Sequence, residues 1–199
     1  MSRHSRPAGG ARKAPYKGFL QRFCRDRSGS TAIEFVMLAL PFSMLVFAIL
    51  ESCISFAGQE VMANAADDVA RQLRTGQIKA VEVTSAKLKT MICGRLEVIV
   101  SSDCPNQLSV DLRKYDTFQE ASAVRFTITD GDIVLLKNSA IDPAGFAITP
   151  GKASTINMLR VFYKWPVMTD FMSKWMANLK DGKTLHFASV TWQNEPFDD

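Results

Sequence analysis

Residues 29–50, GSTAIEFVMLALPFSMLVFAIL, decide the fold of this chain. After a single carboxylate at Glu34, the 16 residues from Phe35 to Leu50 carry no charge. A hydrocarbon core of about 30 Å requires about 20 mainly apolar residues in a helix that rises about 1.5 Å per residue. The segment therefore predicts a membrane-spanning helix, with its membrane part at about residues 34–56. Because a carboxylate is costly in lipid, Glu34 is a candidate functional residue.

The charges on either side of this segment predict its orientation. Residues 1–29 contain eight Lys or Arg and one acidic residue, Asp26. By the positive-inside rule, this end of the chain stays in the cytoplasm and the remainder crosses the membrane. The remaining residues hold 16 Lys or Arg against 19 Asp or Glu, so the net charge of +4 belongs to the leader. This distribution argues against nucleic-acid binding, which is expected to show a basic patch on a folded domain.

A cleaved secretory signal is an alternative interpretation of the same region. It also combines a basic region with an apolar run, but it requires a cleavage site of small residues after the run. Small residues do occur between Ser52 and Gly58. The apolar run is nevertheless longer than that of a signal peptide and continues into helical sequence without a break.

The helical pattern extends well past the apolar run. Residues 58–74 keep apolar side chains at i, i+3 and i+4 spacing, which predicts one helix over residues 30–74 that Thr75 and Gly76 end. Glu51, near the outer end of the membrane part, is expected to extend its carboxylate to water. Alanines at positions 63, 65, 66 and 70 can pack against the chain's own sheet or against other subunits, and we favour the first.

Residues 77–199 predict a single α+β domain with a mostly antiparallel sheet and short helices. The expected domain organisation is therefore a basic cytoplasmic leader (1–29), a long helix (30–76) and this translocated domain (77–199). Helices are expected at residues 85–92 and 169–179, and the residues 142–152 are expected to form loops. Alternation and β-branched content predict strands at residues 96–100, 108–112, 124–128, 133–136, 157–165 and 185–192.

The cysteines separate by compartment. Cys24 precedes the membrane helix and Cys53 lies near its outer end, so neither has an obvious partner. Cys93 and Cys104 fall in the translocated domain, where thiols are oxidised, and flank a short turn-rich segment. We predict a disulfide between these two.

The sequence contains no recognisable catalytic or metal-binding pattern. There is no G-x-S-x-G, P-loop or G-x-G-x-x-G motif. Neither Cys93 nor Cys104 belongs to a C-x-x-C pair, and His186 is the one histidine outside the leader. We therefore expect no metal, no cofactor, no small-molecule substrate and no enzymatic activity, and we interpret His186 as structural.

Several segments carry a resemblance to a known family. Residues 27–36, RSGSTAIEFV, followed by Ala39-Leu40-Pro41 and the apolar run, resemble the start of the TadE family of pseudopilins, which belong to the tight-adherence (Flp-type) pilus system of bacteria. Residues 60–76, 163–166 and 193–197 and the two spaced cysteines are also similar to TadE-type chains. The N-terminal motif is the most specific of these segments.

The resemblance implies a prepilin-type leader that a membrane peptidase cuts after Gly29, so that Ser30 becomes the N-terminus. Glu34, with Phe35 beside it, would belong to the processing and alignment motif, its carboxylate facing the amino group of a neighbouring subunit. The other interpretation of Glu34 is that its charge simply lies in water at the headgroup level. The implied partners are the prepilin peptidase, other pilins or pseudopilins, the inner-membrane assembly machinery and the bacterial inner membrane itself.

Two hypotheses follow from these observations. The first is a minor pseudopilin, non-enzymatic and needed to build an adhesive pilus. The second is an uncleaved, signal-anchored envelope protein with a periplasmic binding or enzymatic domain. Within the first hypothesis, a TadF-like assignment and the place of the subunit in the fibre, at its tip or in the membrane platform all remain open.

Overall fold

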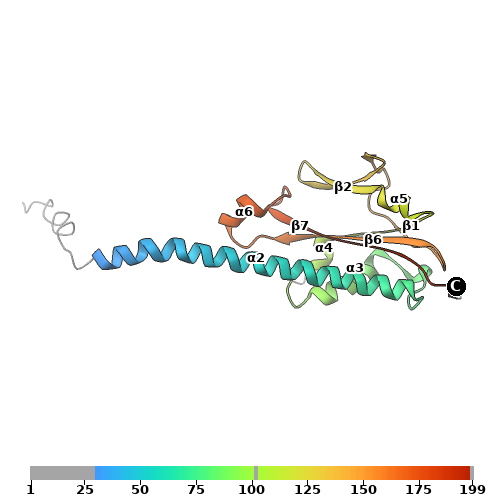
Figure 1. Cartoon of the computed structure of the whole chain (residues 1–199), viewed down its shortest axis with the longest axis horizontal. Coiled ribbons are helices and arrows are strands. Elements are labelled where there is room, and N and C mark those ends of the chain that lie inside the picture. Colours follow the sequence, from blue (N-terminus) through green and yellow to red (C-terminus); the bar gives the residue numbers. More distant parts are fainter. Residues whose placement is uncertain (1–29, 101–102, 198–199) are drawn as a thin grey trace, which may run out of the picture. The chain divides into compact units, whose positions relative to one another are not determined.

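The computed structural model describes residues 30–100 and 103–197, and the predicted cleavage residue Gly29 lies outside them. The elements, drawn in Figure 1, are α2 (Ser30–Arg74), η2 (Ala80–Glu82), α3 (Ser85–Leu96), α4 (Cys104–Gln107), β1 (Leu108–Tyr115), α5 (Phe118–Ser122), β2 (Val124–Thr129), β3 (Asp132–Lys137), β4 (Ala140–Ile141), β5 (Ile148–Thr149), β6 (Ile156–Pro166), α6 (Asp170–Met176) and β7 (Lys183–Gln193). The predicted α+β class is confirmed.

The chain divides into two compact units, Met1–Phe47 and Ala48–Asp199. Helix α2 begins in the first and ends in the second, with the bounds that the apolar pattern predicts. Gly76, at φ 70°, ends it in the left-handed conformation that glycine adopts without strain. Backbone N–H groups of Gly76 and Gln77 donate to the carbonyls of Leu73 and Gln72, which would otherwise lack partners.

The second unit is built on a four-stranded sheet in the order β5-β1-β6-β7. Strands β6 and β7 pair antiparallel from Ile156↔Gln193 to Pro166↔Lys183, and β1 pairs antiparallel with β6 and parallel with the short β5. Helices α2 and α3 lie against one face of this sheet (Figure 1). Their shared core includes Met62, Ala66, Val69, Leu88, Ile92, Leu112, Leu159 and Val161, all nearly inaccessible to solvent.

A second sheet, in the order β2-β3-β4, covers the opposite face (Figure 1). The layers meet in an aromatic cluster in which Phe126 of β2 lies 5.1 Å from Phe162 of β6 and 4.5 Å from Phe187 of β7, measured between ring centroids. Phe146 adds an edge contact to Phe162 at 5.5 Å. Successive side chains of a strand point to opposite faces, so β6 packs against α2 through Leu159 and Val161 and against the second sheet through Phe162.

The alanines of α2 pack inside the domain, as we favoured from the sequence. Ala65, Ala66 and Ala70 are at most 4% exposed, and Ala63 packs against the same core. Small side chains let the backbone of the helix approach the sheet closely, so this surface is used within the chain.

Two sequence-based expectations for secondary structure were wrong. Residues 96–100, predicted as a strand, continue α3 to Leu96 and then turn, because Leu96 is required in the core and its carbonyl accepts from the N–H groups of Ile99 and Val100. The helix expected at 169–179 is shorter, α6, and Leu179 is buried within the turn segment that follows this helix. The short elements η2, α4, α5, β4 and β5 were not predicted.

Candidate functional site

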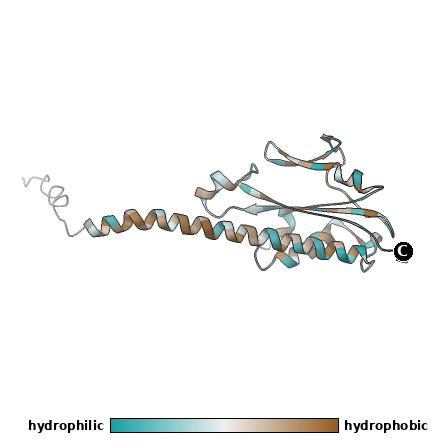
Figure 2. Ribbon diagram, viewed as in Figure 1, coloured by the Kyte–Doolittle hydropathy of each residue, from teal (hydrophilic) through white to brown (hydrophobic). Residues whose placement is uncertain are grey.

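The first half of α2 presents an apolar surface to its surroundings. Of the described residues, only α2 forms a helix long and apolar enough to cross a membrane, and none of its most apolar window is buried. Figure 2 shows the hydrophobic colour running along this part of the helix. The side chains of Phe35, Met37 and Leu38 are at least 70% exposed, and Phe47 is 61% exposed. Such a surface is suited to lipid or to other apolar helices.

The predicted processing residues lie at the start of this helix. Ser30 is its first residue, and Glu34 follows one turn later, so both positions lie on the same side of the helix. The side chains of Glu34 and Phe35 are exposed. Gly29 lies outside the described residues, and the structure therefore gives no geometry for the scissile bond.

Glu51 differs from its expected role at the membrane surface. Its side chain is buried, at 5% exposure, and its carboxylate accepts hydrogen bonds from the N–H of Met168 at 2.5 Å and from the hydroxyl of Thr169 at 2.5 Å. A third, longer bond comes from the N–H of Thr169, which is the N-cap of α6. The expectation that Glu51 extends to water is therefore corrected: it holds the beginning of α6 against α2, 117 residues away in sequence.

The next two turns of α2 continue this attachment, and we call Glu51, Ser55, Gly58 and Gln59 the docking segment. The amide of Gln59 donates to the carbonyl of Phe187 at 2.7 Å and accepts from its N–H at 3.3 Å. A side chain here satisfies both backbone groups on the outer edge of β7, as a neighbouring strand would. Gly58 lies against the indole ring of Trp165.

His186 is enclosed by the docking segment, as its structural interpretation predicts. Its ring stacks on Trp165 with centroids 4.8 Å apart, and its Nε2 shares a hydrogen bond of 2.9 Å with the hydroxyl of Ser55. Its Nδ1 is buried and makes no hydrogen bond within residues 30–100 and 103–197. Burial lowers the pKa of His186 from 6.5 to about 4, because the imidazolium form loses its hydration there.

We expect acid to weaken the fold through His186. The unfolded chain binds a proton near pH 6.5 and the folded chain only near pH 4, so the stabilising contribution is complete above the first value and is lost as pH falls toward the second. A shift of this size corresponds to at most about 3 kcal/mol, and we expect a loss of about 2 kcal/mol after a discount for partial solvent screening. Urea unfolding of the full chain in detergent, followed by tryptophan fluorescence across this pH range, measures it. His186→Gln should remove this part of the pH dependence, and an unchanged slope in that variant would contradict the assignment.

A buried charge network joins β1 and β6 on the face away from α2. Asp111, fully buried, accepts from Nη2 of Arg160 at 2.7 Å and from Nε of Arg113 at 2.8 Å. Arg113 also binds Asp142 and the carbonyl of Gly145. Burial alone would raise the pKa of Asp142, but the N–H of Ala144 and the guanidinium of Arg113 hold it below its ordinary value.

This network holds the loop between β4 and β5 in place through Asp142, Gly145 and Ala147. Oδ1 of Asp111, which accepts from Arg113, also accepts from the N–H of Ala147 at 2.9 Å. Arg160 donates to the carbonyl of Arg125 in the second sheet. Two carboxylates face two guanidiniums, so the charges balance. The arrangement therefore fixes the two sheets and their loop relative to one another.

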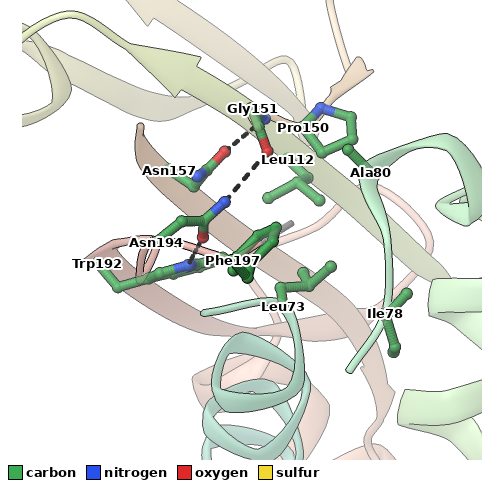
Figure 3. Close-up of a pocket in the computed structure, with 10 residues that line it drawn as sticks. All are labelled: Leu73, Ile78, Ala80, Leu112, Pro150, Gly151, Asn157, Trp192, Asn194 and Phe197. Atoms are coloured by element: carbon green, nitrogen blue, oxygen red, sulfur yellow. Dashed lines mark hydrogen bonds between the residues drawn. The ribbon is translucent and has the colours of Figure 1, made fainter. Parts of the chain in front are cut away.

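The C-terminal tail, for which the sequence suggests either docking of the C-terminus or a contact surface, closes the far end of the core. Asn194 accepts from the indole N–H of Trp192 at 2.7 Å and donates to the carbonyl of Gly151 at 3.1 Å, while the N–H of Gly151 donates to Asn157 at 2.7 Å (Figure 3). The cavity between these side chains and Phe197 has a volume of only about 10 Å³. It has room for one water molecule and none for a substrate.

The tail also contacts the last turn of α2. The N–H of Glu195 donates to the carbonyl of Arg74 at 2.9 Å, and the two side chains form an exposed ion pair at 3.3 Å. The ring of Phe197 occupies the space beside Gly76, where a Cβ would collide with it. The tail residues therefore dock the C-terminus onto the last turn of the helix.

The predicted disulfide between Cys93 and Cys104 is present and links α3 to α4. Cys53 is a free, exposed cysteine, and Cys24 lies outside the described residues. Within the part of the chain that the structure describes, no group of three or more His, Cys, Asp or Glu side chains is placed to hold a metal ion. The described contacts therefore attach α2, which carries the exposed apolar surface, to the domain through the docking segment.

Comparison with known proteins identifies one segment. The model of the family TadE-like protein matches residues 29–71, which confirms the resemblance over Gly29 to Phe35, the apolar run and the helix that enters the domain. No curated protein and no solved structure matches the chain.

Proposed function

We propose that this chain is a minor pseudopilin, processed after Gly29 and anchored in the bacterial inner membrane by α2. Its TadE-like segment supports an association with a tight-adherence pilus. Its N-terminus lies in the cytoplasm and its domain in the periplasm. The partners would be a prepilin peptidase, other pilins or pseudopilins and the inner-membrane assembly machinery.

The observation that carries this proposal is the length of α2 between the predicted cleavage site and the docking segment. The helix begins at Ser30, and the docking segment begins at Glu51, whose carboxylate is used inside the domain. Thr31 to Leu50 is 20 residues, which at about 1.5 Å per residue gives the roughly 30 Å of a hydrocarbon core. We therefore place the outer end of the hydrocarbon span at Leu50, before the residue 56 expected from the sequence.

Processing after Gly29 is the first test. When the full chain is co-expressed with a prepilin peptidase, we expect the membrane form to begin at Ser30 in N-terminal sequencing. Gly29→Val should leave the leader attached, because the scissile peptide must lie extended without a side-chain clash. Gly18→Val, the same change within the leader, is the matched control and should be processed normally. An intact leader on the unaltered chain would instead favour the uncleaved envelope protein.

Glu34 tests the assembly role separately from processing. We expect Glu34→Ala to be cleaved after Gly29 but to reduce surface pili about tenfold, as the loss of about 1.4 kcal/mol of pairing energy would. The physical reason is that a carboxylate at this depth is stabilised by a cationic partner, here the amino group of a neighbouring Ser30. Pili sheared from cells and quantified by immunoblot give the measurement. Val36→Ala, two residues further along α2, is the control, and normal piliation in Glu34→Ala would support the headgroup interpretation.

A further inference from the structure

Helix α6 presents aromatic side chains that nothing in the described chain covers. Phe171 and Trp175 lie four residues apart and so share one face of the helix, with 54% and 80% of their surface exposed. Met168, just before the helix, is 62% exposed. No residue of α6 is buried, although Trp165 and Trp192 are at most 7% exposed elsewhere in the domain. A helix with this composition is poorly explained by packing within the domain alone.

The position of α6 is fixed by Glu51. The three hydrogen bonds that Glu51 accepts all come from Met168 and Thr169, the two residues that directly precede α6. Glu51 directly follows Leu50, the last residue of the proposed hydrocarbon span. The start of α6 is therefore held beside the first residue that follows this proposed span. Figure 1 shows α6 at the end of the domain opposite to the end of α2 at Arg74.

Resting on the proposed membrane span of α2, we propose that α6 is an interfacial anchor whose Phe171 and Trp175 insert into the headgroup region of the same bilayer. Tryptophan favours this zone because its ring is apolar while its N–H can bond to water or to lipid carbonyls. Ile54 and Phe56 of α2, 38% and 73% exposed, follow Leu50 within about 10 Å along the helix axis and extend its apolar surface.

The charges around the aromatic face suit lipid headgroups. Lys174 lies in the last turn of α6 and is exposed, so its amine is free of the core and can reach lipid phosphate. Asp170 lies at the opposite end, in the first turn, where a carboxylate is stabilised by the helix dipole. The anchor would hold the domain at a fixed height and tilt above the bilayer.

The test measures the depth of Trp175 in the full-length chain reconstituted in phosphatidylcholine and phosphatidylglycerol vesicles. The emission of Trp175 is the difference between the unaltered chain and Trp175→Phe, since Trp165 and Trp192 remain buried in both. We expect lipid brominated near the carbonyl end of its acyl chains to reduce this emission about twofold, and aqueous iodide to have little effect. Strong iodide quenching with no effect of brominated lipid would overturn the proposal.

Two further variants, both made in the Trp175→Phe background, separate the possible failures. Phe118→Trp places an exposed tryptophan on α5, at the other end of the domain, and should be quenched by iodide alone. Phe42→Trp reports on α2 itself and should be quenched by lipid brominated deep in the chain. Quenching at position 42 without quenching of Trp175 rejects the anchor but leaves the membrane span intact, whereas no lipid quenching at either position rejects the span. Protection of Trp175 from both quenchers would mean that a protein partner covers α6 and would also overturn the proposal.

Discussion

Asp111→Asn is expected to lower the free energy of unfolding by about 3–5 kcal/mol, enough to abolish the fold of a marginally stable domain. Asp111 is fully buried and is bonded to two guanidiniums, those of Arg160 and Arg113. An asparagine keeps the shape but removes the charge, so the network is left with an uncompensated positive charge. Arg160, at 2% exposure, cannot turn to solvent to regain its hydration. Urea unfolding of the full chain in detergent, monitored by tryptophan fluorescence, gives the difference.

The matched control for this prediction is Asp68→Asn. Asp68 also pairs with an arginine, Arg95 at 3.2 Å, but both side chains are exposed, at 44% and 65%. Water and salt screen such a pair, and we expect a change of at most about 0.5 kcal/mol. Combining Asp111→Asn with Arg160→Met should recover part of the loss, because the buried charge is then removed with its partner. A loss for Asp111→Asn no larger than that for Asp68→Asn would contradict the network's proposed role.

The features of the fold that depend on local pattern could be predicted from the sequence. The 3.6-residue spacing of Met62, Ala65, Ala66 and Val69 identified the helix and the face that it buries, and the core confirms that face. Gly76 identified the end of the helix. Alternation located β2, β3, β6 and β7 to within a few residues.

The errors arose where tertiary contacts outweigh local preference. Residues 96–100 are rich in β-branched side chains, but Leu96 is needed in the core at helical spacing from Ile92 and Leu88. Propensity is a weaker influence than the burial of three such side chains. The strand expectation failed for that reason.

The attachment contacts of the candidate site could not be read from the sequence. Glu51 meets Thr169, and Ser55 meets His186, across 118 and 131 residues, so no local pattern signals them. Arg160 did carry a signal, because it lies between the apolar pairs Met158-Leu159 and Val161-Phe162, where a charge needs a buried partner. Asp111 lies directly opposite it in the β1–β6 register, but that register is known only from the structure. The predicted cleavage motif, in contrast, is a linear signal and needs no fold to be recognised.

Gly58→Ala is expected to destabilise the domain by about 2 kcal/mol, although alanine is the better helix former. A Cβ at this position would lie 2.5 Å from Cη2 of Trp165, well inside van der Waals contact. The indole ring cannot move away, because it is 2% exposed, stacks on His186 and contacts Tyr163 at 6.1 Å between centroids. Either α2 must separate from β6 or the ring must leave its rotamer. Thermal unfolding of the full chain, with near-ultraviolet circular dichroism to report on the indole, measures the effect.

Gly94→Ala provides the matched control, since Gly94 also lies within a helix, α3, but a Cβ there meets no atom within 4 Å. It should stabilise the chain by about 0.5–1 kcal/mol, the ordinary gain in helix propensity. The opposite signs expected for one substitution at two helical glycines separate the clash from propensity. In a Trp165→Phe background, the loss of stability caused by Gly58→Ala should be smaller by at least about 1 kcal/mol, because a smaller ring leaves room for the methyl group. Additive effects of the two substitutions would mean that the close approach of α2 to Trp165 does not hold the docking segment on the sheet.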